Sequence, residues 1–248
     1  MESRYDQTPC PCGSGKPFGG CCGLTAGTAY PEMFAFVRNH PVQGPLYRIF
    51  REREHADSFF IGQVRVSTLE QCRNLENSEA RDTQEGIAVV GIGQTGSSGC
   101  AEPQGSLYVD NEIPQPAVPL VHLGDNTVKL ENAYVLCLSA DYSDYMRKVY
   151  GNYCIMIEKP AAFFYLVNAV MRNLNLIAES RPGPIIYDDN VFLNLNYTST
   201  SGGVGFYKGE RFAMENEYRL RLLPLLPEIE PILIEISSMP SICQKMYR

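Results

Sequence analysis

Four cysteines fall within thirteen positions near the start of the chain, in the stretch "TPCPCGSGKPFGGCCG" that covers residues 8–23. They are Cys10, Cys12, Cys21 and Cys22, spaced as Cys-x-Cys, then eight residues, then Cys-Cys. Such a density predicts either a disulfide cluster or a metal site. The third reading, four cysteines without a shared role, leaves both the density and the glycines between the pairs unexplained.

The cellular compartment separates these readings. The chain opens with "MESRYDQTP", which has no basic segment followed by an apolar run, so we expect no secretory leader. No stretch approaches the roughly 20 apolar residues of a membrane helix, and we expect no membrane contact. We therefore expect a cytoplasmic protein, where disulfides rarely persist. A structural Zn²⁺ held by the four clustered thiolates is then the simplest interpretation.

Composition predicts an ordinary globular domain for the rest of the chain. At 248 residues, with 44% hydrophobic and 20% charged residues, it can bury a core of its own. A net charge of −7 argues against strong non-specific binding to nucleic acid but is compatible with a local basic cleft. The scattered cysteines read as small core residues: Cys72, Cys100, Cys137, Cys154 and Cys243.

The cysteine cluster resembles the SEC-C motif, a zinc knuckle found at the ends of many unrelated bacterial proteins. The resemblance covers about fifteen residues and implies a docking element for SecB-like chaperones or other partners. Family members carry several lysines between the cysteine pairs. Here Lys16 is followed by Pro17, Phe18 and two glycines, so charge-driven docking has less support than zinc binding.

Downstream of the cluster, strand-like segments outnumber helical ones and do not alternate regularly with them. Strands are expected at 45–50, 63–69, 87–93, 133–139, 152–158 and 211–225, and helices at 52–62, 141–150 and after Pro160. This pattern predicts an α+β fold with a mixed or antiparallel sheet. We divide the chain into a knuckle (1–24), a linker with one short helix (25–44) and a main domain (45–248).

Candidate catalytic residues are few, because the chain has no phosphate-binding loop or dinucleotide fingerprint and only three histidines. One of them, His55, lies among charged residues and reads as solvated. The first expected strand carries Tyr47 and Arg48, and the second ends in Ser67 and Thr68.

The late segment "MENEYRL" places Glu215, Glu217 and Arg219 at alternate positions of an expected strand. Two carboxylates and a guanidinium on one face are costly to bury unless they are paired or used. The equally weighted alternative is a solvent-facing strand, since antiparallel sheets often have one wet side.

Arginine on a first strand, Ser-Thr on a second and Glu-x-Glu on a late strand are similar to the motifs of ADP-ribosyltransferases. Residues 45–222 also resemble a widespread bacterial family of uncharacterised function, which we assign to the same superfamily as nucleic-acid-modifying phage-defence toxins. The segments that carry this resemblance are "LYRIF", "GQVRVSTL", "AYVLCLS", "YGNYCIMIE", "PIIYDD" and "YKGERFAMENEYRL".

The resemblance implies a role for each matched residue. Arg48 would bind the NAD pyrophosphate, and Ser67 with Thr68 would hold the nicotinamide ribose. Glu217 would stabilise the oxocarbenium-like transition state, while Glu215 would orient or deprotonate the acceptor. Either Tyr47 or Tyr153 is suited to stacking on nicotinamide.

Three functions follow as expectations. The first is a transferase that moves ADP-ribose from NAD to RNA, DNA or protein, a toxin or antiviral effector with a chaperone or antitoxin partner. The others are an NAD glycohydrolase using the same site and a non-catalytic adaptor. The polar stretch 196–203 reads as a loop near the acceptor, and Lys208 and Arg211 as phosphate contacts or surface charges.

Overall fold

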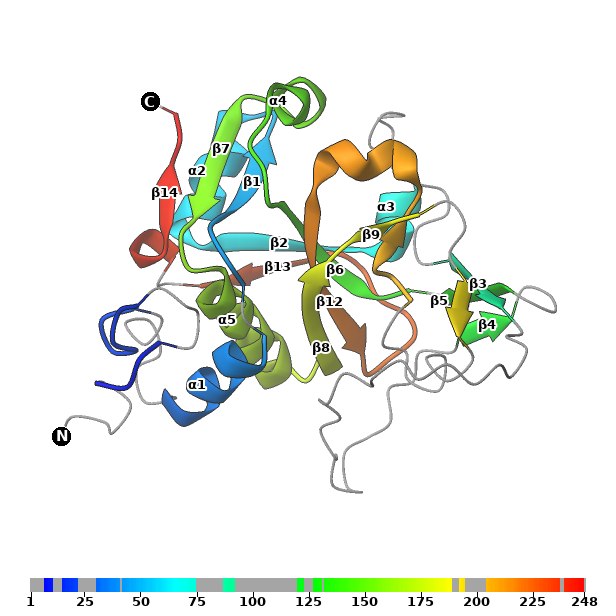
Figure 1. Cartoon of the computed structure of the whole chain (residues 1–248), viewed down its shortest axis with the longest axis horizontal. Coiled ribbons are helices and arrows are strands. Elements are labelled where there is room, and N and C mark those ends of the chain that lie inside the picture. Colours follow the sequence, from blue (N-terminus) through cyan, green and yellow to red (C-terminus); the bar gives the residue numbers. More distant parts are fainter. Residues whose placement is uncertain are drawn as a thin grey trace.

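The computed structural model describes residues 7–10, 15–21, 30–40, 42–74, 87–91, 120–122, 127–130, 132–188, 192–194, 204–236 and 239–247. Within these ranges the chain has the expected α+β fold, with a mostly antiparallel main sheet and several helices around it (Figure 1). None of the helices in the described ranges combines the length and the apolar character needed to cross a membrane.

The main sheet has eight strands, and its strand pairs are antiparallel. Six strands follow one another in the order β13 (Ile232–Glu235), β2 (Gln63–Thr68), β6 (Tyr134–Ser139), β1 (Leu46–Phe50), β7 (Tyr153–Ile157) and β14 (Cys243–Lys245). Two more branch from β6: β12 (Glu217–Pro224) pairs with β6, and β8 (Ile177–Pro184) pairs with β12.

The sheet is split beside β6, because β1 and β2 share one of its edges. One edge of β6 pairs with β12 along its whole length, from Tyr134 to Ser139. The other edge is shared, because β2 pairs at Tyr134 and Val135 whereas β1 pairs only at Ser139. Between these points β1 and β2 diverge, so the middle of β6 lacks a strand neighbour on that edge. A split of this kind leaves backbone groups that side chains can satisfy.

The sequence explains the elements that line the split. Along β2 the buried residues Val64 and Val66 alternate with exposed or half-buried ones, as the alternating pattern predicts. The helix before it, α2 (Arg53–Ile61), ends at Gly62, as predicted. Gly62 has φ +112°, and a Cβ there would lie 2.2 Å from the Ile236 carbonyl oxygen, so only glycine lets the chain after β13 approach.

Besides α2, which packs on β1, β2, β7 and β14, three more helices lie around the sheet. The most buried is α5 (Pro160–Asn173), which begins at a proline as predicted and packs on β8 and β13. Beside it lies α1 (Tyr30–Asn39), the short helix expected in the linker (Figure 1). The third, α4 (Asp144–Tyr150), contacts β1. Short helix α3 (Leu69–Arg73) follows β2 directly.

Smaller elements complete the described part of the chain. One four-stranded sheet joins β10 (Phe192–Asn194), β3 (Ile87–Gly91), β5 (Thr127–Leu130) and β4 (Leu120–His122). A two-stranded parallel sheet joins β9 (Ile186–Tyr187) and β11 (Tyr207–Lys208). Two 3₁₀ helices, η2 (Glu210–Glu215) and η3 (Met239–Ser241), precede β12 and β14.

The prediction of a single strand over 211–225 is wrong in its first part. Residues up to Glu215 form η2, and β12 begins only at Glu217. Asn216 separates them in the left-handed conformation, with φ 42° and ψ 51°. The two glutamates therefore do not project from one strand face as expected; they lie on two different elements joined by a sharp turn.

Candidate active site

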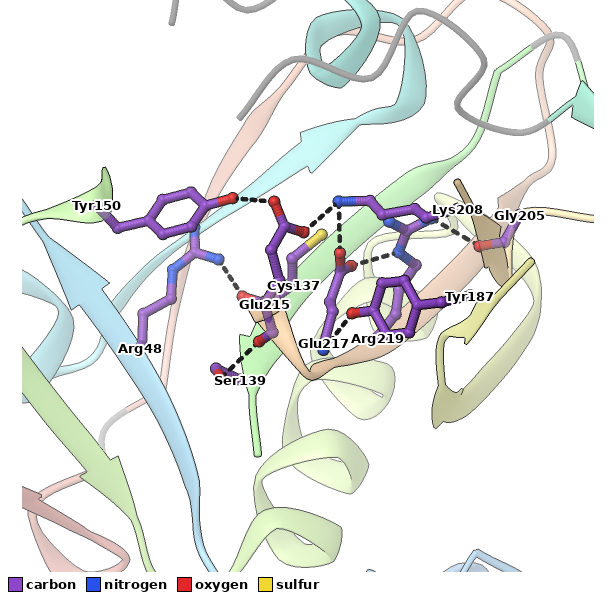
Figure 2. A network of polar contacts seen from close by, with 10 residues as sticks. All are labelled: Arg48, Cys137, Ser139, Tyr150, Tyr187, Gly205, Lys208, Glu215, Glu217 and Arg219. Carbon is purple, nitrogen blue, oxygen red and sulfur yellow. Dashed lines mark hydrogen bonds and ion pairs between the residues drawn. The ribbon is translucent and has the colours of Figure 1, made fainter. Parts of the chain in front are cut away.

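The two glutamates converge from η2 and β12 on a single lysine (Figure 2). Lys208 Nζ lies 2.7 Å from Glu215 Oε2 and 2.8 Å from Glu217 Oε2. All three side chains are buried, with residue exposures of 7%, 3% and 6%. The alternative of a solvent-facing Glu-x-Glu strand is thus wrong, and Lys208 is a buried partner of the carboxylates.

Each carboxylate has a second partner. Glu217 Oε1 accepts a hydrogen bond of 2.7 Å from Arg219 Nε, and its backbone N–H donates to the Tyr187 hydroxyl at 2.7 Å. Glu215 Oε1 accepts a hydrogen bond of 2.6 Å from the Tyr150 hydroxyl at the end of α4. Arg219 of β12 and Tyr150 of α4 thus fix the two carboxylates, and Tyr187 of β9 holds the backbone of Glu217.

Two fully buried arginines of β12 anchor the segment that delivers Lys208. Arg219 Nη1 donates to the Gly205 carbonyl at 2.6 Å, and Arg221 Nη1 donates to the Val204 carbonyl at 2.7 Å. Arg221 also pairs with Glu179 of β8 at 3.1 Å. Glu217, Arg219 and Arg221 thus alternate along one strand face. Burying these three charges would be strongly unfavourable without the ion pairs and hydrogen bonds described above.

The pKa values of the two carboxyls move in opposite directions. Burial raises the pKa of Glu217, but the charges of Arg219 and Lys208 outweigh it, and the result lies well below the ordinary value. Burial also raises the pKa of Glu215; Lys208 opposes this, the charge of Glu217 adds to it, and the result lies above the ordinary value. Two carboxyls with separated pKa values are the usual basis for dividing charge stabilisation from proton transfer.

Arg48 lies in the split of the sheet. Its guanidinium Nη1 donates to the carbonyl oxygen of Cys137, in the part of β6 that has no strand neighbour on that edge (Figure 2). Arg48 also lies 5.8 Å from the ring centroid of Phe50. One of the five N–H donors of this side chain is thereby committed to holding the split open, and others remain for a ligand.

A cavity of about 570 Å³ opens at this split, within the size range of small-molecule sites. Five of the predicted site residues line it: Tyr47, Arg48, Ser67, Glu215 and Glu217. Their convergence is not trivial, because they come from β1, β2, η2 and β12 and span 171 positions, from 47 to 217. Residues that the sequence did not single out also line it: His55, Gln63, Arg65, Cys137 and Tyr150. Lys208, interpreted from the sequence as a phosphate contact or a surface charge, lines it too and is buried.

Two of the predicted residues lie elsewhere. Thr68 does not line the cavity; its buried hydroxyl accepts a hydrogen bond from the Gln71 N–H and caps α3. Tyr153 packs edge-on against Tyr247, with ring centroids 5.2 Å apart, and is also absent from the lining. Tyr47 is therefore the better placed aromatic of the two considered, and it stacks on Tyr142 at 5.9 Å.

The scattered cysteines divide into two groups. Cys154 and Cys243 are buried, as expected of small core residues. Cys72 and Cys137 instead line the cavity. The hydrogen bond with Cys72, burial and the charge of Glu217 raise the pKa of the Cys137 thiol well above its ordinary value. Cys137 is thus held as a thiol, which is a poor nucleophile. Cys100 lies outside the described residues.

The N-terminal cysteine segment packs on the main domain. Cys10 and Cys21 are buried, Phe18 is fully buried, and all three belong to the main hydrophobic core. The Lys159 ammonium donates to the Cys21 carbonyl at 3.0 Å. Cys12 and Cys22 lie outside the described residues, as does the stretch 195–203. No group of three metal-ligating side chains occurs among the residues that the structure does describe.

Comparison of the chain with protein-family models, with curated proteins and with solved structures finds no match in any of the three. Functional assignment therefore depends on the geometry of this cavity.

Proposed function

We propose that the chain is an NAD-dependent ADP-ribosyltransferase whose active site is the cavity at the split of the main sheet. The observation that carries the proposal is the meeting of Arg48, Ser67 and Glu217, from three different strands, in one cavity of ligand size. These are the residues that the superfamily resemblance selects, and a single dinucleotide must reach all of them.

The electrostatics of the cavity supports this chemistry. When the glycosidic bond of NAD breaks, the bonding electron pair leaves with nicotinamide and the ribose becomes cationic. Glu217 is held ionised by Arg219 and Lys208, so a fixed negative charge is ready before the reaction begins. A carboxylate has about four acceptor sites, so Glu217 keeps capacity for a ribose hydroxyl beside Arg219, Lys208 and the Cys137 thiol.

Glu215 would serve the second half of the reaction. The acceptor group forms a bond to the ribose C1′ and must lose a proton. Glu215 has a raised pKa and touches the cavity, which suits a general base better than a carboxyl of ordinary pKa. Tyr150 fixes its orientation through the 2.6 Å hydrogen bond.

The test uses pure protein and NAD labelled on its adenylate half, offered total RNA, single-stranded DNA and lysate protein. We expect label on one of these classes with the wild type and none with Glu217→Gln. Glu158→Gln is a matched control, because Glu158 is exposed and does not line the cavity. Nicotinamide release without transfer would make the protein an NAD glycohydrolase, and a folded protein that leaves NAD intact would favour a binding adaptor.

We infer that the N-terminal segment holds one structural Zn²⁺ through Cys10, Cys12, Cys21 and Cys22. The two of these cysteines that are described, Cys10 and Cys21, are both buried in the main core. Their backbone N–H groups donate to the carbonyls of Lys16 at 2.9 Å and Phe18 at 3.0 Å. Zinc would cross-link this segment, and thiolate ligation implies a reducing compartment such as the cytoplasm. Metal analysis should give one zinc per chain, reduced in Cys10→Ser, and a protein without zinc would refute the site.

A further inference from the structure

The cavity lining contains a second polar group of residues, on β2, that differs chemically from the glutamate cluster. Gln63, Arg65 and Ser67 occupy alternate positions of β2, and all three line the cavity. Val64 and Val66 between them are fully buried on the other face. The alternation of β2 therefore presents a row of polar side chains along the cavity, beginning near Ser67 and continuing away from it.

Arg65 is the cation of this row. Its side chain is exposed and forms no hydrogen bond or ion pair with the described residues. The antiparallel register sets Leu233 opposite it, and Glu235 opposite Gln63. Glu235 is the nearest carboxylate by register, yet no ion pair joins it to Arg65. An exposed arginine in the lining of a cavity, without an ion pair among the described residues, is available to a ligand.

The charge balance of the lining also favours an anionic ligand. The cavity contains three cationic side chains, Arg48, Arg65 and Lys208, against two carboxylates, although the whole chain has a net charge of −7. Lys208 is taken up by the two glutamates, and Arg48 gives one donor to the Cys137 carbonyl. His55 and Gln63 also line the cavity and add further hydrogen-bonding groups to it.

We propose that Arg65, with Gln63 and His55, forms an anion subsite that binds the diphosphate of the dinucleotide, together with the Arg48 donors that the Cys137 carbonyl does not use. The proposal rests on the transferase function for the identity of the ligand, but the subsite itself does not depend on turnover. A guanidinium matches the geometry of phosphate oxygens and can bind two of them at once.

The test is equilibrium binding by calorimetry with three probes: ADP-ribose, inorganic diphosphate and nicotinamide riboside, which lacks the diphosphate. We expect Arg65→Leu to weaken ADP-ribose and diphosphate binding by roughly tenfold or more, and to leave nicotinamide riboside unchanged. Arg53→Leu is the matched control, since Arg53 is on neighbouring α2, pairs with Asp57 and does not line the cavity. It should bind every probe like the wild type.

The outcomes separate the subsite from the transferase. Equal ADP-ribose affinity of Arg65→Leu and wild type would overturn the subsite, as would a wild type that binds none of the phosphate probes. Loss of diphosphate binding in Arg65→Leu, from a wild type that neither binds nicotinamide riboside nor cleaves NAD, would support the subsite and refute the transferase.

Discussion

Two groups of charged residues in the cavity lining, the glutamate cluster and the polar row of β2, use charge in opposite ways. In the glutamate cluster Glu215, Glu217 and Lys208 are buried and paired with one another, so the fold depends on them. In the row of β2, Arg65 is exposed and forms no ion pair with the described residues. A buried charge that loses its partner is strongly destabilising, whereas an exposed one is not. Substitutions should therefore separate the glutamate cluster from the row of β2 by stability before any activity is measured.

The largest effect is expected from Arg219→Met. The substitution keeps much of the volume but removes a cation that Glu217 and the Gly205 carbonyl both use. We expect the free energy of unfolding to fall by about 3–5 kcal/mol, measured by denaturant unfolding. A loss below about 1 kcal/mol would mean that the glutamate cluster contributes little to folding, and the contrast with the row of β2 would disappear.

Lys208→Met should come next, with a dependence on pH. Lys208 lowers the pKa of both carboxyls, so its removal raises both, and the folded variant holds protons that the wild type releases. The loss of stability should thus be greatest at neutral pH, about 2–3 kcal/mol, where two buried carboxylates lack their shared cation. It should shrink as the pH falls towards the ordinary glutamate value of 4.5.

Unfolding curves of Lys208→Met at several pH values test this sign. The charge-conserving variant Lys208→Arg should show a smaller loss with little change across pH. A Lys208→Met penalty that stays constant from neutral to acidic pH would indicate lost packing against Phe212, whose ring centroid lies 5.3 Å from Nζ, in place of lost charge.

Tyr150→Phe should have a moderate effect, because one hydrogen bond to a charged group disappears and the ring stays. We expect a loss of about 1.5 kcal/mol in the free energy of unfolding. The Tyr150 hydrogen bond lowers the pKa of Glu215, so its removal should raise that pKa further. If Glu215 is the general base, the acidic limb of the rate–pH profile should move to higher pH. An unmoved limb would exclude Glu215 from proton transfer.

The smallest effect should come from Arg53→Leu. Its ion pair with Asp57 is long, at 3.6 Å, and both side chains are largely exposed. Asp57 also keeps Lys245 and Tyr247 as partners. We expect no resolvable change in the midpoint of thermal unfolding. A clear shift of this midpoint would show that exposed ion pairs also stabilise this protein. The contrast between buried and exposed charges would then be weaker.

The sequence predicted the parts of the site that depend on local pattern. Alternation placed Ser67 on the exposed face of β2, and the caution about burying Glu217 beside Arg219 anticipated a paired cluster. It could not predict which groups would complete the pairing. Lys208 and Tyr150 contact Glu215 from 7 and 65 positions away in the chain. No residue spacing in the sequence indicates that these side chains are in contact.

Other differences come from competition between local and tertiary preferences. His55 is exposed, as its charged neighbours predict, but the sequence does not show that α2 also brings it into the wall of the cavity. Thr68 matches the residue type of a serine-threonine motif, but its hydroxyl caps the N-terminus of α3, which begins directly after β2. The residues before Glu217 have a strand-like sequence pattern, but they form the 3₁₀ helix η2. The turn at Asn216 separates η2 from β12.

That turn also limits how residue 216 can vary. Asn216 is one of the few non-glycine residues of the described chain with a positive φ, and its carbonyl accepts a hydrogen bond of 2.8 Å from the Ala140 N–H. Asparagine and glycine tolerate this backbone, whereas β-branched side chains do not. Mutational tolerance at position 216 should hence be narrow although its side chain is exposed and contributes no group to the cavity. In a library randomised at position 216, we expect selection for residues that adopt the left-handed backbone conformation, mainly asparagine and glycine.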